Sequence, residues 1–181
     1  MEPISRARTT SLRLAVTAGA IALTLGLGGC AAISDLLGGG APDRDEETGQ
    51  VKEGGDVDVF ELAVGDCLNL GEDGELTAAA VVPCDEEHTE EIYHEFALPD
   101  GDWPGDDELS KQAEEGCYSA FEGFAGIAYE DSTLGFFTLT PTEAGWTDKS
   151  IADRLVQCVV YEPDENGDSK PLTGSLKGAA R

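Results

Sequence analysis

The chain has 181 residues, and its 37 acidic residues outnumber its 11 basic ones, so the formal net charge at pH 7 is −26. Nucleic acid is excluded as a partner, because binding it requires a basic face that displaces counterions from phosphates. The same charge repels anionic lipid headgroups, so attachment to a membrane requires a separate anchor.

Residues 1–29 have the layout of a secretory signal peptide. Three arginines precede an apolar stretch over residues 14–27, which ends on small residues. The alternative is an uncleaved membrane anchor over residues 14–33, which is just long enough to span a bilayer. Three glycines crowd the end of that segment, and each costs a helix about 1 kcal/mol relative to alanine. A cleaved signal is therefore favoured, and both interpretations place residues 31–181 outside the cytoplasmic membrane.

The signal ends on Leu27-Gly28-Gly29-Cys30, which resembles a bacterial lipobox. In such a motif the peptide is cut before the cysteine, and a diacylglyceryl group is attached to the sulfur. One acyl chain binds a membrane reversibly, whereas two give stable anchoring. We therefore expect Cys30 to hold the protein at the extracytoplasmic face of the cell membrane.

Residues 30–56 are rich in glycine, small and acidic residues. They contain few large apolar groups whose burial could offset the conformational entropy lost when a chain becomes ordered. We interpret them as a tether between the lipidated cysteine and a domain over residues 57–178. Removal of residues 1–29 leaves 8 basic and 36 acidic residues, a net charge of −28. Such a charge favours solubility, and it also suits wall cations or a basic partner.

Five strands and one helix are expected within residues 57–178. Apolar residues recur at helical spacing over residues 106–126, where Pro104 and Gly126 are suitable start and stop signals. The resulting fold class is α+β, a small antiparallel sheet with one main helix packed across it and two disulfides. Alternation and β-branched or aromatic content predict the strands at residues 57–64, 76–82, 88–98, 134–140 and 154–162.

Four cysteines remain besides Cys30, an even number that indicates disulfides in a small exported domain, with three possible connectivities. Chain order favours Cys67 with Cys84, and Cys117 with Cys158, the second pair joining the helix to the last strand.

One detail conflicts with the first of these bridges. A tight hairpin centred on residues 71–74 places Cys67 opposite Ala78. A bridge from Cys67 to Cys84 then needs a bulge, a longer loop or another strand pairing.

Residues 82–95 combine a cysteine, two histidines and several carboxylates, a composition that suits either a metal site or a surface strand. In a strand, His88 and His94 lie about 20 Å apart, too far to share an ion. In a helix they point apart, and the Glu91-x-x-His94 pair lacks the second copy that di-iron bundles use. No metal or cofactor is therefore expected. His94 is interpreted as a core histidine on the face of Ile92, and His88 as a donor to a nearby carbonyl or carboxylate.

Common catalytic motifs are absent from the sequence, including GxSxG, HExxH, GxGxxG and the P-loop. Residues 164–169, DENGDS, begin like a calcium loop but have Ser169 where glycine belongs and Ser175 in place of the bidentate glutamate. A polar turn is the preferred interpretation. No catalytic residue is assigned.

A series of short motifs follows in a fixed order: VGDC at residues 64–67, VPCD at 82–85, His88, Glu91, WP at 103–104, Cys117, Phe121, Pro141, Trp146, DR at 153–154, Cys158 and TGSLKG at 173–178. Together they resemble the septum formation domain of actinobacterial exported proteins. The resemblance covers nearly all of residues 57–178 and implies an envelope-exposed domain linked by name to cell division, without established catalytic residues. Besides the four bridging cysteines it suggests His88, Trp103, Trp146 and Arg154 as structural or binding residues.

The sequence as a whole predicts a lipid-anchored, non-enzymatic domain that binds or scaffolds an envelope protein or a wall polymer. Two alternatives come from other classes: an enzyme acting on cell wall polymer, and a cation-binding surface module. A pocket with shifted carboxylate pKa values would favour the enzyme, and an exposed apolar patch would favour a protein partner.

Overall fold

The computed structural model describes residues 42–47, 49–70 and 78–181. The signal peptide, the lipobox and Cys30 lie outside these residues, as do residues 71–77 between Leu70 and Ala78. Ala41–Arg181 form one compact unit. None of the helices within the described ranges has the length and apolar character needed to span a bilayer.

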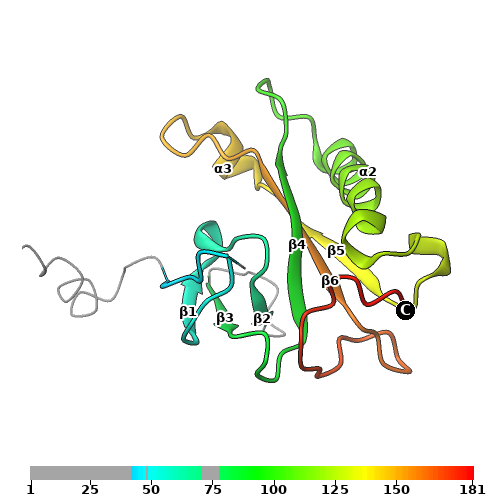
Figure 1. Ribbon diagram of the computed structural model, residues 1–181. Coiled ribbons are helices and arrows are strands. Elements are labelled where there is room, and N and C mark those ends of the chain that lie inside the picture. Colours follow the sequence, from blue (N-terminus) through cyan, green and yellow to red (C-terminus); the bar gives the residue numbers. More distant parts are fainter. Residues whose placement is uncertain (1–41, 48, 71–77) are drawn as a thin grey trace, which may run out of the picture. The chain divides into compact units, whose positions relative to one another are not determined.

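The unit is built on one antiparallel sheet of six strands in the order β1-β3-β2-β4-β6-β5, with helix α2 lying along one face (Figure 1). This confirms the predicted α+β class. The strands are β1 (Gly55–Asp58), β2 (Cys67–Asn69), β3 (Ala78–Val82), β4 (Glu90–Ala97), β5 (Gly135–Leu139) and β6 (Leu155–Tyr161). The helices are α2 (Asp106–Ala125), α3 (Glu143–Thr147) and two 3-10 turns, η2 (Val59–Glu61) and η3 (Tyr129–Asp131).

All five predicted strands exist, but the first is shorter than expected. The strand predicted over residues 57–64 ends at Asp58, whose carboxylate accepts a hydrogen bond from the Phe60 amide at 3.0 Å and so caps η2. The sequence pattern missed β2 and α3. Both are too short for an apolar period to show, since β2 has three residues and α3 has five.

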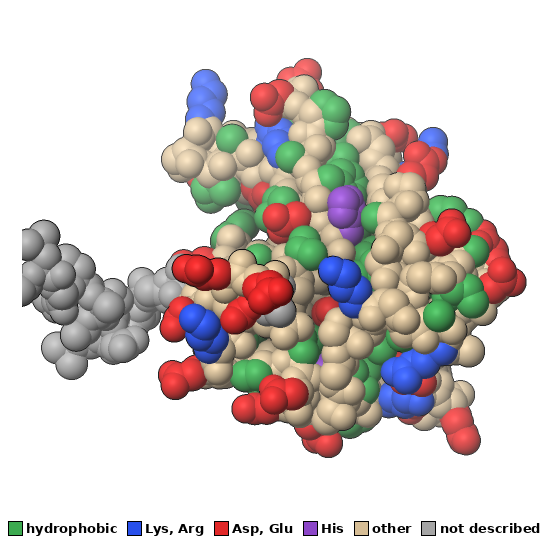
Figure 2. All heavy atoms as spheres, viewed as in Figure 1, with side chains coloured by type: hydrophobic (Ala, Val, Ile, Leu, Met, Phe, Trp, Pro, Cys, Tyr) green, Lys and Arg blue, Asp and Glu red, His purple; other side chains and the backbone are tan. Residues whose placement is uncertain are grey.

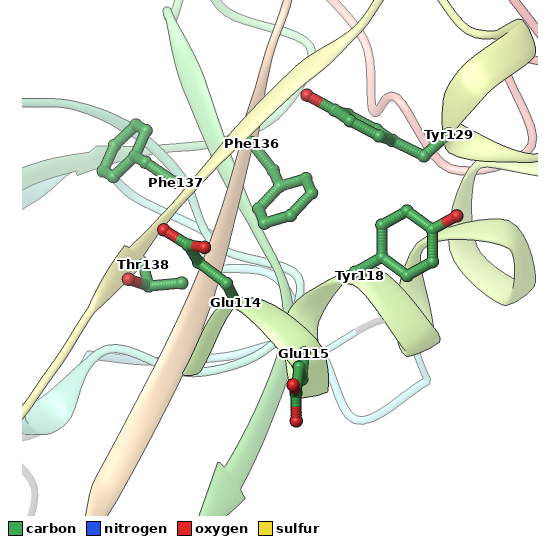
Figure 3. A pocket seen from close by; sticks show the side chains of 7 residues that line it. All are labelled: Glu114, Glu115, Tyr118, Tyr129, Phe136, Phe137 and Thr138. Carbon is green, nitrogen blue, oxygen red and sulfur yellow. The ribbon is translucent and has the colours of Figure 1, made fainter. Parts of the chain in front are cut away.

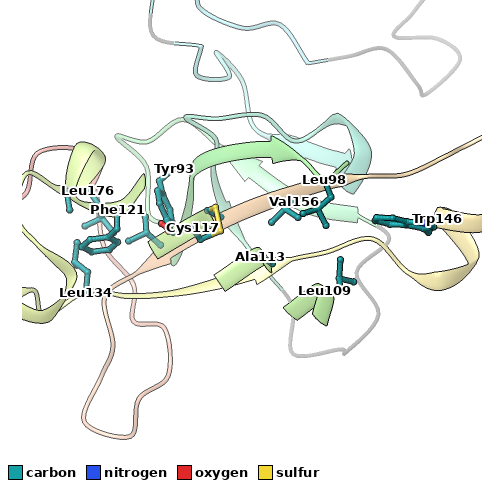
Figure 4. Packing of buried hydrophobic residues seen from close by; sticks show 13 residues of the cluster. Tyr93, Leu98, Leu109, Ala113, Cys117, Phe121, Leu134, Trp146, Val156 and Leu176 are labelled. Carbon is teal, nitrogen blue, oxygen red and sulfur yellow. A yellow bond between two sulfur atoms is a disulfide. The ribbon is translucent and has the colours of Figure 1, made fainter. Parts of the chain in front are cut away.

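Helix α2 follows the predicted period closely. It ends at Gly126, whose φ of 80° is the left-handed conformation that glycine adopts at helix ends. Its buried side chains lie on one stripe, four residues apart, and face β4, β5 and β6 (Figure 4). They are Leu109, Ala113, Cys117, Phe121 and Ala125.

Two disulfides staple this frame, and both pairings are the predicted ones. Cys117 on α2 is bonded to Cys158 on β6, with a Cα–Cα distance of 5.4 Å, and this bridge ties the helix to the sheet. Cys67 is bonded to Cys84 with a Cα–Cα distance of 5.2 Å. The register sets Cys67 opposite Val82, and not opposite Ala78, which a tight hairpin would have required. Cys84 follows Val82 by two residues, so this register brings it within reach of Cys67.

A β-bulge interrupts the pairing of β4 with β6. Ile92 is opposite Val159 and His94 is opposite Cys158, so Tyr93 is the extra residue. The Tyr93 side chain reaches α2, where its hydroxyl donates to the Cys117 carbonyl oxygen at 2.7 Å. Burial raises the pKa of this hydroxyl.

The bulge corrects the interpretation of His94. Ile92 packs in the cluster on the face away from α2, whereas His94 stacks on Phe96, which packs on the α2 face. The two residues therefore lie on opposite faces of the sheet. His94 is partly exposed, and the fully buried histidine is His88.

The compact unit includes the second half of the segment expected as a tether. Val51 is buried among the residues on the sheet face away from α2. Arg44 forms a bidentate pair with Asp66, whose carboxylate is inaccessible to solvent, with one N–O distance of 2.9 Å. The Ala63 amide also donates to Asp66, at 2.9 Å, so the buried charge is satisfied.

Candidate functional site

A groove of about 600 Å³ runs between α2 and β5, and we call it the α2–β5 groove. The residues that line it come from the helix, from η3 and from the strand (Figure 3). They are Glu114, Glu115, Tyr118, Tyr129, Phe136, Phe137 and Thr138. The site thus joins segments that are close in space through the packing of α2 on the sheet.

Aromatic rings form the floor of the groove. The rings of Tyr129 and Phe136 meet edge to face with centroids 4.9 Å apart, and Tyr118 meets Tyr129 at 6.0 Å. Phe121 continues this stack into the core, 5.1 Å from Tyr129. The floor is therefore anchored in the core and does not depend on loosely held side chains.

Carboxylates form the rim of the groove. Glu114 and Glu115 are exposed on α2, and Figure 3 shows Glu114 extending toward Thr138 on β5. Tyr118 is 45% exposed, and its hydroxyl donates a hydrogen bond to the Glu130 carboxylate. This bond lowers the pKa of Glu130 and raises that of Tyr118. The groove is thus apolar at its floor and negative at its rim.

The strand beside the groove is an edge strand. β5 is the last strand of the sheet, and no other strand of the described residues pairs with its outer side. Phe136 packs toward α2, whereas Phe137 packs on the opposite face and meets Tyr161 with ring centroids 5.9 Å apart. Because consecutive residues from both faces line the groove, it reaches over the strand edge.

None of the residues lining the groove was singled out from the sequence. Tyr118 lies on the polar side of the α2 pattern, and Phe136 and Phe137 suit a buried strand equally well. One signal was present, since residues 135–139 contain apolar side chains on both faces and no charge. A solvated edge strand usually carries charged residues.

His88 is fully buried and lies just before β4. Its backbone pairs with that of Leu172, through N–O distances of 3.0 and 2.8 Å. The ring Nδ1 lies 2.9 Å from the Glu86 carbonyl oxygen, and a carbonyl only accepts, so Nδ1 carries the hydrogen. The predicted donation to a carbonyl is thus confirmed. None of the described residues forms a hydrogen bond with Nε2.

Trp103, Trp146 and Arg154 come together at the other end of the sheet, where α3 precedes β6. The two indole rings meet edge to face with centroids 5.5 Å apart, and the Arg154 guanidinium lies 3.8 Å from the centroid of the Trp146 ring. Arg154 also donates to the Trp146 carbonyl oxygen at 3.0 Å, and the Trp146 indole donates to the Gly101 carbonyl oxygen at 2.9 Å. These bonds hold α3 and the β4–α2 connection to the sheet.

The C-terminal segment closes over a buried glutamate. The Glu91 carboxylate is 2% exposed and accepts hydrogen bonds from the Ser175 hydroxyl and the Leu176 amide, both at 2.7 Å. Burial raises the pKa of Glu91, although the hydrogen bonds from Ser175 and Leu176 oppose the shift. Gly178 donates to the Phe124 carbonyl oxygen at 2.8 Å and so ties the segment to α2.

Two clusters of side chains have the residue types that bind cations, but other bonds already occupy their ligand atoms. Cys67, Cys84 and Glu91 lie within 4.8 Å of one another, but the two sulfurs are bonded together and carry no thiolate. In the DENGDS stretch the Asp164 carboxylate accepts from the amides of Asn166 and Asp168, at 2.7 and 3.0 Å. The polar turn expected there is confirmed.

Comparison with protein families gives a match over most of the described unit. The model of the family described as septum formation matches residues 64–181. The chain belongs to this family. Comparison with curated proteins and with solved structures gives no match.

The short motifs that suggested the septum formation domain mostly build its frame. In the first, Gly65 has φ 97° and donates to the Ile92 carbonyl oxygen at 2.8 Å, next to the buried Asp66. In the last, Ser175 and Leu176 satisfy Glu91. None of the motif residues lines the α2–β5 groove. The groove therefore lies beside the frame, which supports its floor through the contact of Phe121 with Tyr129.

Proposed function

We propose that this protein is a lipid-anchored envelope protein whose septum formation domain binds another envelope component, without catalysis, during formation of the division septum. Family membership supports the link to the septum, and the lipobox at Cys30 supports the anchor. The observation that carries the binding role is the α2–β5 groove, an aromatic floor with an acidic rim beside an open strand edge.

Binding suits the described side chains better than catalysis does. Three carboxylates are buried in the described part of the chain, and all are engaged by hydrogen bonds. Asp66 is paired with Arg44, Glu90 accepts from the Leu70 amide at 3.1 Å, and Glu91 is closed off by Ser175 and Leu176. A general acid or base must reach a substrate, and these groups do not reach the surface.

The septal role is tested by following a C-terminal fluorescent fusion of the whole protein in dividing cells. The matched control carries the same fluorescent protein directly after residue 56, so that it keeps the signal, Cys30 and the acidic segment. We expect the full protein to gather at the septum and the control to spread over the envelope. An even distribution of both would contradict the septal role.

The anchor is tested by labelling cells with an alkyne-bearing fatty acid. Label should enter the wild-type protein and be lost in Cys30→Ala, which should also leave the membrane fraction. Label retained in the variant would show that the anchor is wrongly assigned. Incubating the purified protein with cell wall polymer addresses the alternative of an enzyme, because release of soluble fragments would contradict a binding role.

A further inference from the structure

We propose that the α2–β5 groove takes up an extended segment of another protein, which pairs with the outer edge of β5 and presents apolar and basic side chains to α2. This inference rests on the proposed binding function and names the chemistry of its partner. Addition of a strand to a sheet edge gives affinity through main-chain hydrogen bonds and specificity through alternate side chains.

The two edges of the sheet differ in a way that points to β5. The edge strand β1 has the sequence GDVD, and its Asp56 and Asp58 are both exposed, which discourages pairing with another chain. The edge strand β5 has the sequence GFFTL, without a charge or a proline. An unpaired edge strand without charged residues readily forms backbone hydrogen bonds with a strand of another chain, so β5 is the edge at which we expect a partner to bind.

The spacing of groups on α2 matches the spacing of side chains along a strand. Glu114 and Tyr118 are separated by one helical turn, about 6 Å along the axis. Side chains two residues apart on one face of a strand are separated by about 6.6 Å. A strand beside β5 can therefore place an apolar side chain against Tyr118, Tyr129 and Phe136, and a basic one against Glu114 two residues away.

Charge favours a basic segment over a second copy of this chain. Glu114 and Glu115 at the groove and Glu130 beside Tyr118 are negative, and the whole chain carries a net charge of −26. Figure 2 shows carboxylates spread over the visible face, where they outnumber the lysine and arginine side chains. Pairing of two β5 edges would bring like charges together, which is unfavourable at an interface.

The first experiment measures binding of a labelled peptide to the full-length protein in mild detergent at low salt. The probe is acetyl-Thr-Phe-Thr-Lys-Thr-Phe-Thr-Lys-amide carrying a fluorophore, in which phenylalanine and lysine alternate on one face. The peptide with glutamate in place of lysine serves as the control. We expect saturable binding of the lysine peptide, and equal binding of both peptides would overturn the charge argument.

Charge reversal at the groove tests where the peptide binds. The variant Glu114→Lys/Glu115→Lys should lose about tenfold in affinity, because two attractive pairs become repulsive. The matched control is Glu86→Lys/Glu87→Lys, which reverses two adjacent exposed carboxylates outside the groove with the same change in net charge. Equal losses in the two variants would show that only net charge matters and would overturn the site.

Pairing with the β5 edge is tested with two N-methylated versions of the same peptide. Methyl groups on alternate amides block one edge of an extended peptide, and methyl groups on the remaining amides block the other. Only one edge can pair with β5, so one version should bind like the parent peptide and the other should not bind. Equal affinity of both versions would overturn the added-strand geometry.

Two further outcomes separate this inference from the proposed function. If no peptide binds while the full protein still gathers at the septum, the groove inference fails and the septal function stands. If only one of the two N-methylated peptides binds but the protein does not gather at the septum, the groove inference stands and the septal function fails. A dimer in light scattering that is lost in Thr138→Pro would identify a second copy as the occupant and overturn the basic partner.

Discussion

The bridge between Cys117 and Cys158 should account for a large part of the stability of the septum formation domain. Both cysteines are inaccessible to solvent, and the bridge is the covalent link between α2 and the sheet. The perturbation is the double variant Cys117→Ala/Cys158→Ala, which leaves no free thiol. Its matched control is Cys67→Ala/Cys84→Ala, which removes the other bridge.

The expected magnitude follows from the loops that the two bridges close. With a sequence separation of 41, the Cys117–Cys158 bridge removes unfolded-state entropy worth about 4 kcal/mol. The Cys67–Cys84 bridge, with a separation of 17, is worth about 3 kcal/mol on the same expression. Since a domain is stable by about 5–15 kcal/mol, either loss should leave it marginal.

Urea unfolding followed by tryptophan fluorescence measures the two losses, and hydrogen exchange locates them. Removal of Cys117–Cys158 should raise amide exchange first in α2, whereas removal of Cys67–Cys84 should raise it first in β2 and β3. A loss below about 1 kcal/mol for Cys117→Ala/Cys158→Ala would refute the reasoning. Faster exchange at β2 and β3 than at α2 in that variant would do so as well.

Three further predictions concern buried polar and stacked groups. The raised pKa of Glu91 means that the folded state holds this proton more tightly than the unfolded state does, so stability should fall as pH rises from about 4.5 to the folded-state pKa. Melting temperatures measured across pH should lack this fall in Glu91→Gln. If the melting temperature of the wild type rose with pH relative to that of Glu91→Gln, the prediction would be wrong. His88→Ala should cost about 2–4 kcal/mol through the lost hydrogen bond to Glu86 and the cavity it leaves. The wild-type melting temperature should not respond to a chelator, and a response that disappears in His88→Ala would make His88 a metal ligand. Arg154→Lys should cost about 1–2 kcal/mol in urea unfolding because lysine cannot stack flat on Trp146 while donating to its carbonyl, and an unchanged stability would show that the stacking contributes little.

Much of the frame could be predicted because it depends on local pattern. The recurrence of Leu109, Ala113, Cys117 and Phe121 on one stripe predicts α2, and Gly126 predicts its end. Chain order favoured the two disulfide pairs among three connectivities. His88 was expected to donate to a nearby carbonyl or carboxylate because it follows Cys84 closely, and its Nδ1 lies 2.9 Å from the Glu86 carbonyl oxygen.

Register and strand order could not be read from the same pattern. The alternation in residues 88–98 is indifferent to an extra residue, so the bulge at Tyr93 and the opposite faces of Ile92 and His94 come from pairing with β6. The register of Cys67 opposite Val82 likewise comes from the pairing of β2 with β3. In both cases the partner strand decides which residue faces the core.

By itself the sequence determined the acidic composition, the helix and the family resemblance, because each depends on residue types and their local spacing. It favoured the cysteine pairing that the structure has, among three connectivities. Only the tertiary structure decided that β5 lies at the sheet edge and that Tyr118, Tyr129 and Phe136 meet beside it. The physical reason is that these residues come from α2, η3 and β5, whose mutual placement is set by packing of the helix across β4, β5 and β6. A groove made from three elements has no sequence period of its own.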